Sequence, residues 1–422
     1  MSRLRQTTPI VALSAALGSA QTIAWASSNY LPAILAAPIA LDLGISRATV
    51  FGAFSVALVV TGLAGPTVGR LIDRGHGRAM LVASNIVHIV GLLWLAAAND
   101  TATLFAAWVV LGAGMAMGLY DAAFATLVRL HGQAARTPIT GITLIAGFAS
   151  TVGWPLTAWI AGAEGWRAAC MAWAAINLFI ALPLNAWCIP SAPAHRPAER
   201  EAEKSSADAM PTHHDQDEAP PRNAFSMLVL YFAATAFVTS AMGAHLPGLL
   251  AAGGISAATA LAAAALMGPA QVAARLTEFL AMRRYRFHPM FTARIAGALQ
   301  PLGVAALLAA GGVPLLVSIA PFAYTLLYGA GNGMLTIAKG TLPLALFGPE
   351  NYGRRQGLLN VVARAMQAVA PFAFGWMMDE LGTKASLLVS AAVSLVALGA
   401  LLAIRVRVRA RPDAPASPMS VR

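Results

Sequence analysis

The chain of 422 residues is 58% hydrophobic and only 11% charged, whereas a soluble globular domain carries about a quarter charged residues. This composition excludes an ordinary soluble protein, and arginine placed on one side of a bilayer explains the net charge of +11 better than nucleic-acid binding does. Cys170 and Cys188 lie in one apolar run and would be about 27 Å apart on a helix, which excludes a disulfide between them.

Twelve apolar runs follow one another along the chain, each near or above the roughly 20 residues that a bilayer crossing needs. Their approximate limits are 11–38, 49–71, 79–98, 102–127, 138–163, 168–189, 225–250, 257–281, 290–312, 314–346, 356–377 and 384–404. No period-two alternation runs through them and an open sheet cannot lie in lipid, so each run is expected to be a helix. The sequence therefore predicts an all-α polytopic membrane protein with twelve transmembrane helices.

The loop between the second and third runs is short and rich in charge. It resembles the G-x-x-x-D-R-x-G-R-R type loop of the major facilitator superfamily at five positions, namely Gly69, Asp73, Arg74, Gly77 and Arg78. The resemblance implies a gating loop on the cytoplasmic side that latches the two halves of a transporter. On composition alone, the same residues would be a positively charged turn between two spans.

A second motif is similar to the same family. Gly165-Trp166-Arg167 stands between the fifth and sixth runs, as a GWR turn does in many members. The order of motifs is most similar to the branch that holds oxalate–formate antiporters and monocarboxylate transporters. The fourth run, however, lacks the arginine that many proton-coupled members carry near its start, and the first lacks the motif typical of monocarboxylate carriers. The resemblance therefore implies the fold more firmly than the cargo.

The two halves of the chain repeat one another weakly. Gly112 and Gly114 match Gly329 and Gly331, 217 residues further on. Six plus six runs with internal repetition predict two pseudo-symmetric six-helix bundles. The expected divisions are an N-terminal bundle at 1–190, a cytoplasmic linker at 191–224, a C-terminal bundle at 225–404 and a basic cytoplasmic tail at 405–422.

Lysine and arginine are distributed unequally between the two sides of the membrane. With the N-terminus in the cytoplasm, 21 of the 28 fall on the cytoplasmic side, four lie within spans, and 3 lie outside, namely Arg47, Arg167 and Lys384. Because positive charge is retained in the cytoplasm, both termini are expected there, in the cell inner membrane. We expect the protein to be a monomer.

Five ionisable residues within the spans need an offsetting role, since each costs roughly 2.5–3.5 kcal/mol there. Arg364 has no acid within helical reach, so it binds an anion or pairs with an acid from another helix. Arg275 joins that anion site or pairs with Glu278, one turn along the same helix. In oxalate-type carriers, cationic residues on helices eight and eleven hold the substrate carboxylates. Arg275 and Arg364 lie on those helices, so the resemblance implies the same role for them. Asp121 pairs with Lys339 on the corresponding span of the other half, or carries a coupling proton.

Amide and hydroxyl groups within the spans complete the candidate site. The substrate-binding candidates are Arg364, Arg275, Lys339, Asn29, Tyr30, Tyr120, Asn332 and Asn360. Taken singly, each uncharged group is more often a hydrogen bond between helices than a ligand contact. The sequence offers no metal or cofactor site, because the histidine pair at 213–214 has no further ligands nearby and no nucleotide motif is present.

Together these features predict a secondary active transporter that moves a small organic anion, such as a mono- or dicarboxylate, by alternating access with proton coupling or exchange. The excess of cations over acids in the C-terminal spans motivates the anionic cargo. A drug or metabolite exporter of the same superfamily is the alternative. A membrane enzyme or sensor is a distant third, because no span holds a nucleophile–base pair and no sizeable segment lies outside the spans.

Overall fold

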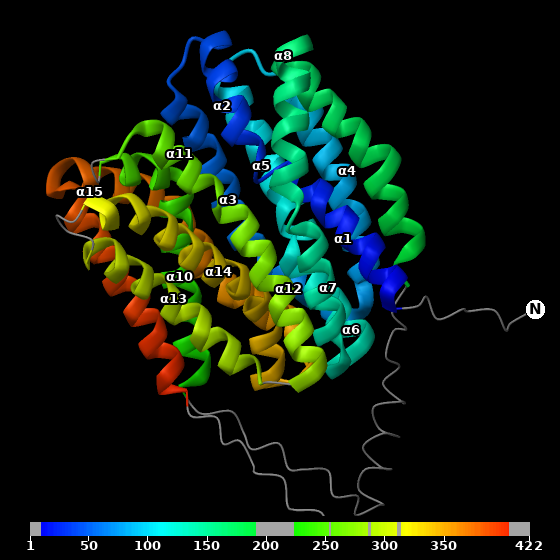
Figure 1. The fold of residues 1–422 in the computed structure, drawn as a ribbon. Helices are drawn as coiled ribbons and strands as arrows, with labels where there is room; N and C mark the ends of the chain where they lie inside the picture. Colours follow the sequence, from blue (N-terminus) through cyan, green and yellow to red (C-terminus); the bar gives the residue numbers. More distant parts are fainter. Residues whose placement is uncertain (1–9, 191–222, 253–254, 286–287, 310–313, 405–422) are drawn as a thin grey trace, which may run out of the picture.

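The computed structural model describes residues 10–190, 223–252, 255–285, 288–309 and 314–404. The predicted tail, and all but the last two residues of the predicted linker, lie outside these described residues. Every element in the described residues is helical, and the helices lie side by side along one common direction (Figure 1).

Residues 10–190 form the first half of the fold. Its elements are α1 Ile10–Ala26, α2 Leu31–Asp42, α3 Arg47–Leu71, η1 Ile72–His76, α4 Gly77–Ala96, α5 Thr101–Gly118, α6 Tyr120–His131, η2 Gly132–Ala135, α7 Arg136–Ala146, α8 Ala149–Ile176, η3 Asn177–Ala181 and η4 Leu184–Cys188.

Residues 223–404 form the second half of the fold. Its helices are α10 Ala224–Ala251, α11 Ala257–Ala265, α12 Met267–Tyr285, α13 Pro289–Ala309, α14 Pro314–Phe347 and α15 Tyr352–Ala403.

Six helical stretches of the described chain are long and apolar enough to cross a membrane, judged by length and composition. Three of them, Arg47–Ala96, Thr101–Cys188 and Tyr352–Ala403, contain 50, 88 and 52 residues. A straight helix of 50 residues would be about 75 Å long, more than twice the hydrocarbon thickness, so each stretch holds more than one crossing. Breaks at Gly165 (φ 86°) and Gly382 (φ 80°) divide α8 and α15, and glycine tolerates this left-handed backbone. With these breaks, the helical segments follow the twelve predicted runs.

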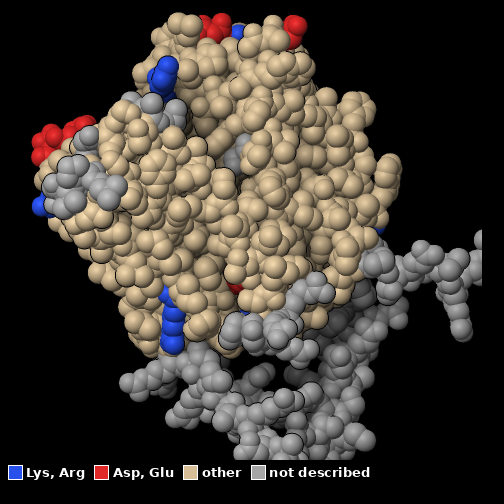
Figure 2. Space-filling view, in the orientation of Figure 1, with Lys and Arg blue, Asp and Glu red and all other residues tan. Residues whose placement is uncertain are grey.

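The surface between the two ends of the molecule is apolar. Phe179, Trp187 and Phe372 are among the large side chains exposed there, at 73%, 81% and 81%. Figure 2 shows lysine, arginine, aspartate and glutamate near the ends and a broad belt of other residues between them. An apolar belt of this extent requires lipid around it.

Several spans are interrupted within the membrane region. Residues 27–30 separate α1 from α2, Leu119 separates α5 from α6, and Leu266 separates α11 from α12. An interruption leaves backbone groups without helical partners, which lipid does not tolerate but a polar interior does. The interruptions therefore direct attention to the centre of the fold.

The two halves meet along α3 and α15 through glycine. A Cβ atom built on Gly69 would overlap the carbonyl oxygen of Gly353, and one built on Gly357 would lie 2.6 Å from the carbonyl oxygen of Gly65. Only glycine permits backbones to approach so closely, as in other small-residue contacts between membrane helices. Further contacts join α6 to α15 and α7 to α12 and α14.

The predicted gating loop closes this contact at one end, which we call the Asp73 end. The Asp73 carboxylate accepts hydrogen bonds from the backbone N–H groups of Gly353 and Arg354, both at 2.8 Å. These are the first residues of α15, where unsatisfied N–H groups and the helix dipole favour a negative charge. Gly77 packs so tightly on Thr126 that a Cβ would lie 2.7 Å from its hydroxyl oxygen, and Arg74 is exposed.

The opposite end, which we call the Asp42 end, is held within the first half. Arg167 donates a hydrogen bond to Asp42 at the end of α2 and another, of 2.9 Å, to the carbonyl oxygen of Ala98. The Trp166 indole N–H also donates a hydrogen bond to the Asp42 carboxylate, at 3.2 Å. The side chains of the predicted Gly165-Trp166-Arg167 turn thus link α8 to the end of α2 by hydrogen bonds.

Candidate functional site

One face of α15 carries a stripe of polar side chains into the centre of the molecule. Gln356, Asn360 and Arg364 are four residues apart and therefore lie above one another on one helix face. All three are buried, and Arg364 is 8% exposed. The Asn360 amide donates to the backbone carbonyl of Gln356 at 2.9 Å, and Arg364 donates to Gln367 at 2.9 Å.

Asp121 lies opposite this stripe because the fourth span is interrupted. Leu119 has extended backbone angles (φ −79°, ψ −175°), so α6 begins anew at Tyr120 and places Asp121 in its first turn. The N-terminus of a helix stabilises a carboxylate through its free N–H groups and its dipole. The interruption thus makes a favourable place for a negative charge at membrane depth.

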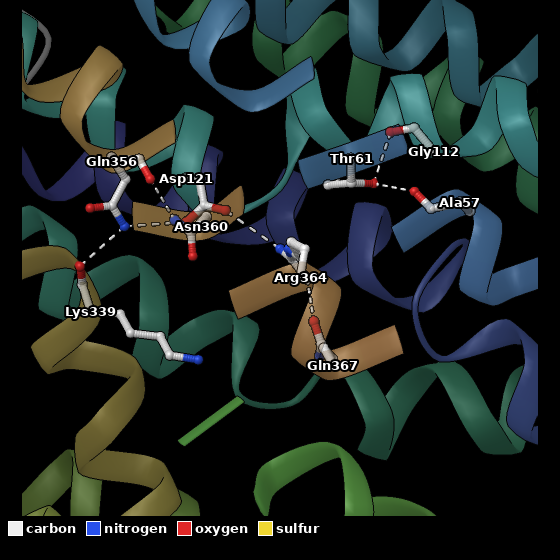
Figure 3. A network of polar contacts seen from close by, with 9 residues as sticks. All are labelled: Ala57, Thr61, Gly112, Asp121, Lys339, Gln356, Asn360, Arg364 and Gln367. Atoms are coloured by element: carbon white, nitrogen blue, oxygen red, sulfur yellow. Dashed lines mark hydrogen bonds and ion pairs between the residues drawn. The ribbon is translucent and has the colours of Figure 1, made fainter. Parts of the chain in front are cut away.

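Asp121 pairs with Arg364 across the contact between the halves. Their closest atoms, Arg364 Nη2 and Asp121 Oδ2, are 3.5 Å apart, and the side chains are 9% and 28% exposed. The Gln356 amide donates to Asp121 at 3.3 Å and to the Lys339 carbonyl at 3.2 Å. Figure 3 shows these groups converging from α6, α14 and α15.

The partner of Asp121 corrects one expectation from the sequence. A pair with Lys339 is one of the two roles expected for Asp121, the other being to carry a coupling proton; among the described residues Asp121 forms its ion pair with Arg364 instead. The guanidinium of Arg364 reaches the carboxylate directly from the facing helix. The Lys339 side chain points into the same region, close enough for its charge to act on Asp121 and Arg364 (Figure 3). No hydrogen bond or ion pair of its ammonium group to a described residue is formed.

Arg275 is buried between the halves and fully engaged. It donates to the carbonyl oxygens of Gly333 at 3.3 Å and Thr143 at 3.4 Å. It also donates to the side chains of Gln271 at 3.4 Å and Thr336 at 3.2 Å. Because Thr143 belongs to α7 of the first half, this arginine links the halves.

Of the two roles expected for Arg275, the pair with Glu278 is not formed among the described residues. The two ion pairs among the described residues are Arg167–Asp42 and Arg364–Asp121, although Glu278 is also buried, at 6% exposed. The guanidinium of Arg275 turns toward α7 and α14, and away from the acid one turn along its own helix.

The remaining polar candidates occupy different places. Asn29 and Tyr30 lie in the interruption between α1 and α2, and the buried side-chain oxygen of Asn29 has no hydrogen-bond partner in the described ranges. Asn332 accepts a hydrogen bond of 3.3 Å from Thr239 inside the second half. Asn360 belongs to the α15 stripe, so it is the uncharged candidate nearest to the ion pair.

Aromatic rings cluster at the interruptions of the first half. The rings of Trp25 and Tyr120 have centroids 5.0 Å apart, and those of Trp25 and Tyr30 are 5.9 Å apart. Trp154 of α8 meets Tyr30 edge to face at 5.7 Å. Arg275 lies close enough for its charge to act on both tyrosine hydroxyls. The aromatic cluster and the arginine thus face one another across the centre.

A small cleft lies between α3, α6 and α15, with Asp121, Asn360 and Arg364 in its wall. Its volume is about 20 Å³, which has room for about one water molecule. A cleft of this size holds no organic solute, so binding there requires the halves to separate. No group of three His, Cys, Asp or Glu side chains in the described ranges could hold a metal ion.

Gln356 and Gln367 are the members of this network that the sequence reasoning missed. The signal was present, because Gln356, Asn360 and Arg364 recur every four residues within an apolar run. Taken singly, however, none of these residues indicates a shared site; the signal lies in their common spacing.

Comparison with known proteins gives one family and several similar folds. The sequence model of the Major Facilitator Superfamily matches residues 17–338. The human organic anion transporter MFSD10 (TETRAN) has a similar structure, with a TM-score of 0.65, 15% identity, and coverage of 95% of this chain and 100% of that one. No curated protein sequence matches the chain.

Two sugar carriers have similar structures. The proton:xylose symporter XylE gives a TM-score of 0.70 at 11% identity, covering 93% of this chain and 95% of that one. The E. coli fucose:proton symporter FucP gives 0.65 at 15% identity, covering 93% and 98%. Identities this low establish a shared fold and leave the cargo open.

Proposed function

The chain belongs to the major facilitator superfamily, and on that premise we propose that it carries a small organic anion, such as a mono- or dicarboxylate, across the cell inner membrane. Members of this fold are secondary transporters and not enzymes. The two predicted bundles, at 1–190 and 225–404, rock about the central site as a monomer, so that the site opens to each side in turn. Transport is driven by proton coupling or by exchange.

The Lys339 ammonium group is the observation that carries this proposal. It lies within the membrane beside the Arg364–Asp121 pair, and its charge is not matched by an acid among the described residues. The cluster of two cations and one acid therefore has an excess positive charge. A cation at membrane depth is costly unless an anion or water attends it, and a substrate carboxylate supplies that anion.

The geometry supports a binding sequence. A carboxylate in the cleft would contact the Arg364 guanidinium, which lines it and can hold a carboxylate with two parallel hydrogen bonds. The charge of Lys339, which acts on the same residues, would add to the attraction. Asp121 sits 3.5 Å from Arg364, so it competes with the substrate for the same cation. Binding of the anion would loosen the Asp121 contact, which joins the halves, and so favour their separation.

The gating loop supplies the closing contact on the cytoplasmic side. We place the Asp73 end in the cytoplasm, because the loop residues Arg70, Arg74 and Arg78 contribute to the excess of positive charge there. In this conformation Asp73 binds the first turn of α15 and the Asp73 end is closed. In this state, solute in the central site would therefore have no path to the cytoplasm.

Uptake into proteoliposomes tests the proposal. Proteoliposomes that contain the purified protein are loaded with an unlabelled carboxylate. Exchange with labelled oxalate, formate or lactate is then measured for wild type, Lys339→Ala and Arg364→Ala. We expect saturable exchange in wild type, a loss of at least tenfold in Lys339→Ala, and partial recovery in Lys339→Arg. Lys384→Ala, which removes an exposed lysine at the Asp42 end and away from the central site, is the matched control. Exchange that is equal in wild type and Lys339→Ala contradicts the assignment.

A drug or metabolite exporter is the second candidate, and the aromatic cluster favours it. Trp25, Tyr30, Tyr120 and Trp154 give the first half an apolar wall suited to a flat, amphipathic cargo. Broad resistance to toxic compounds on expression, without carboxylate exchange, would select this alternative.

A further inference from the structure

Glu278 is a buried acid that the charge cluster does not use. It lies in α12, seven residues before the helix ends at Tyr285, or about 10 Å from that end. Its side chain is buried, and its Oε2 atom has no hydrogen-bond partner among the residues that the structure describes. The Thr292 hydroxyl of α13 hydrogen-bonds to the carboxyl group.

The groups that face Glu278 come from several helices. Arg136 of α7 and Arg275 of its own helix are close enough for their charges to act on the carboxyl group, and Tyr231 of α10 faces it as well. Neither arginine forms an ion pair with it in the described chain. The one cation of α14, Lys339, is instead close enough for its charge to act on Arg364 and Asp121.

The placement of Glu278 ties its surroundings to the transport cycle. The α7–α12 contact is one of those that join the two halves at the Asp73 end, and Arg136 begins α7. When the halves separate there, water reaches Glu278. When they close, the carboxyl group is buried with one oxygen unsatisfied, which is costly for a charged group and less so for a neutral one.

A cavity lies within the second half, and Tyr231, which lines it, is close enough to Glu278 for the charge of the acid to act on its hydroxyl. Its volume is about 30 Å³, enough for about two water molecules. Tyr231 and Gln300 line it, and within the described part of the chain the Tyr231 hydroxyl and the Gln300 side-chain oxygen are both buried without hydrogen-bond partners. Thr239 and Asn332 line it further along α10 and α14. Unsatisfied polar groups around a space of this size are the usual setting for buried water.

We propose that Glu278 binds the coupling proton, and that water in this cavity carries the proton between the centre of the membrane and Glu278 past the Tyr231 hydroxyl. The inference rests on the proposed transport function and assigns the proton to Glu278 rather than to Asp121, which is engaged by Arg364. Proton binding neutralises Glu278 and permits the Asp73 end to close. Release follows when that end opens to water.

Infrared difference spectroscopy of the purified full-length protein tests the assignment without any knowledge of the cargo. Spectra recorded over a pH titration show the carbonyl stretch of each carboxyl group that becomes protonated. We expect a band from a buried acid in wild type, its loss in Glu278→Gln, and its retention in Asp121→Asn. Glu164→Gln, which removes an exposed acid, is the matched control. A buried-acid band that persists in Glu278→Gln overturns the proposal.

Two further variants keep the test decisive if Glu278→Gln folds poorly. Thr292→Val retains the acid and removes its hydrogen-bond donor, so the band should shift to higher frequency. Tyr231→Phe should leave the band in place but slow its appearance several-fold after a rapid pH change. An unshifted band in Thr292→Val rejects the Glu278 assignment, and an unchanged rate in Tyr231→Phe rejects the cavity as the route. Because these readouts need no substrate, absence of carboxylate exchange would count against the proposed function and not against this inference.

Discussion

Arginine and lysine have different tasks in the central cluster, and the difference follows from their chemistry. The planar guanidinium of Arg364 donates in two directions at once, to Asp121 at 3.5 Å and to Gln367 at 2.9 Å. An ammonium group is a compact and strongly hydrated charge, and under the proposed function this suits Lys339 to bind a mobile anion. The substitution of one for the other is therefore not conservative here.

The Arg364–Asp121 pair gives a prediction for stability. Asp121→Asn or Arg364→Gln alone leaves the other charge unpaired, so each should lower the free energy of unfolding by about 3 kcal/mol, the low end for a buried ion pair, because Asp121 is 28% exposed. The double variant should lose less than the sum of the two single losses. Thermal unfolding of the purified variants measures this, and strictly additive losses would show that the two side chains do not interact.

The arginine on α12 shows why spacing within one helix is weak evidence for pairing. Glu278 lies three residues after Arg275, which favours a pair on an isolated helix. In the folded protein, the Arg275 guanidinium donates instead to the carbonyl oxygens of Thr143 in α7 and Gly333 in α14. A sequence read one helix at a time contains no information about these neighbours.

At the scale of elements, the α3–α15 contact gives a second prediction. Gly69→Ala should hold the Asp73 end open, because the added methyl group would overlap the Gly353 carbonyl group. With Cys170 and Cys188 replaced by serine and a reporter cysteine at Ala122 in the cleft, we expect maleimide labelling to become several-fold faster.

A matched control exists on the same helix. A Cβ added at Gly52 would lie 3.8 Å from its nearest neighbour, Phe105, so Gly52→Ala should label at the wild-type rate. Equal rates for Gly69→Ala and Gly52→Ala would mean that the glycine contact does not control closure.

The start of α13 gives a third prediction, which concerns pH. His288 Nδ1 accepts a hydrogen bond of 3.1 Å from the Met290 N–H, and burial, with the charges of Arg136 and Arg294, lowers the pKa of His288 below its ordinary value of 6.5. Because the folded state favours the neutral imidazole, this contribution to stability is present above the ordinary pKa. It is lost as the pH falls through the lowered pKa.

Thermal unfolding of wild type and His288→Asn over a pH series checks this. Asparagine also accepts the hydrogen bond but does not titrate, so wild type should lose more stability than the variant on going from about pH 7 to about pH 5. A parallel loss in both proteins would exclude His288 as the cause.

The sequence predicts the positions of the spans but not the interruptions within them. Hydropathy located the spans, because an apolar run of about 20 residues has few other uses. It did not reveal that the fourth span is interrupted at Leu119, since an interruption within an apolar run leaves hydropathy unchanged. The position of Asp121 at a helix N-terminus, and hence its reach to Arg364, depends on that interruption.

At the scale of the whole molecule, the closed Asp73 end and the charged centre are joined by one contact between the halves, that of α3 with α15. The loop residues that the sequence identified by family resemblance close the end through Asp73, 280 residues before the helix that it caps. The centre lies further along the same contact between α3 and α15. Whatever loosens the centre is therefore placed to release the end.

The most direct test of this account is a pair of distances between spin labels, measured by double electron–electron resonance spectroscopy. Spin labels at Ala134 and Glu350 report on the Asp73 end, and labels at Ala163 and Lys384 on the Asp42 end; all four positions are exposed. On addition of a transported carboxylate, we expect the first distance to lengthen in a new population while the second shortens. Distances that stay fixed, or that change in the same direction at both ends, would contradict alternating access about this site.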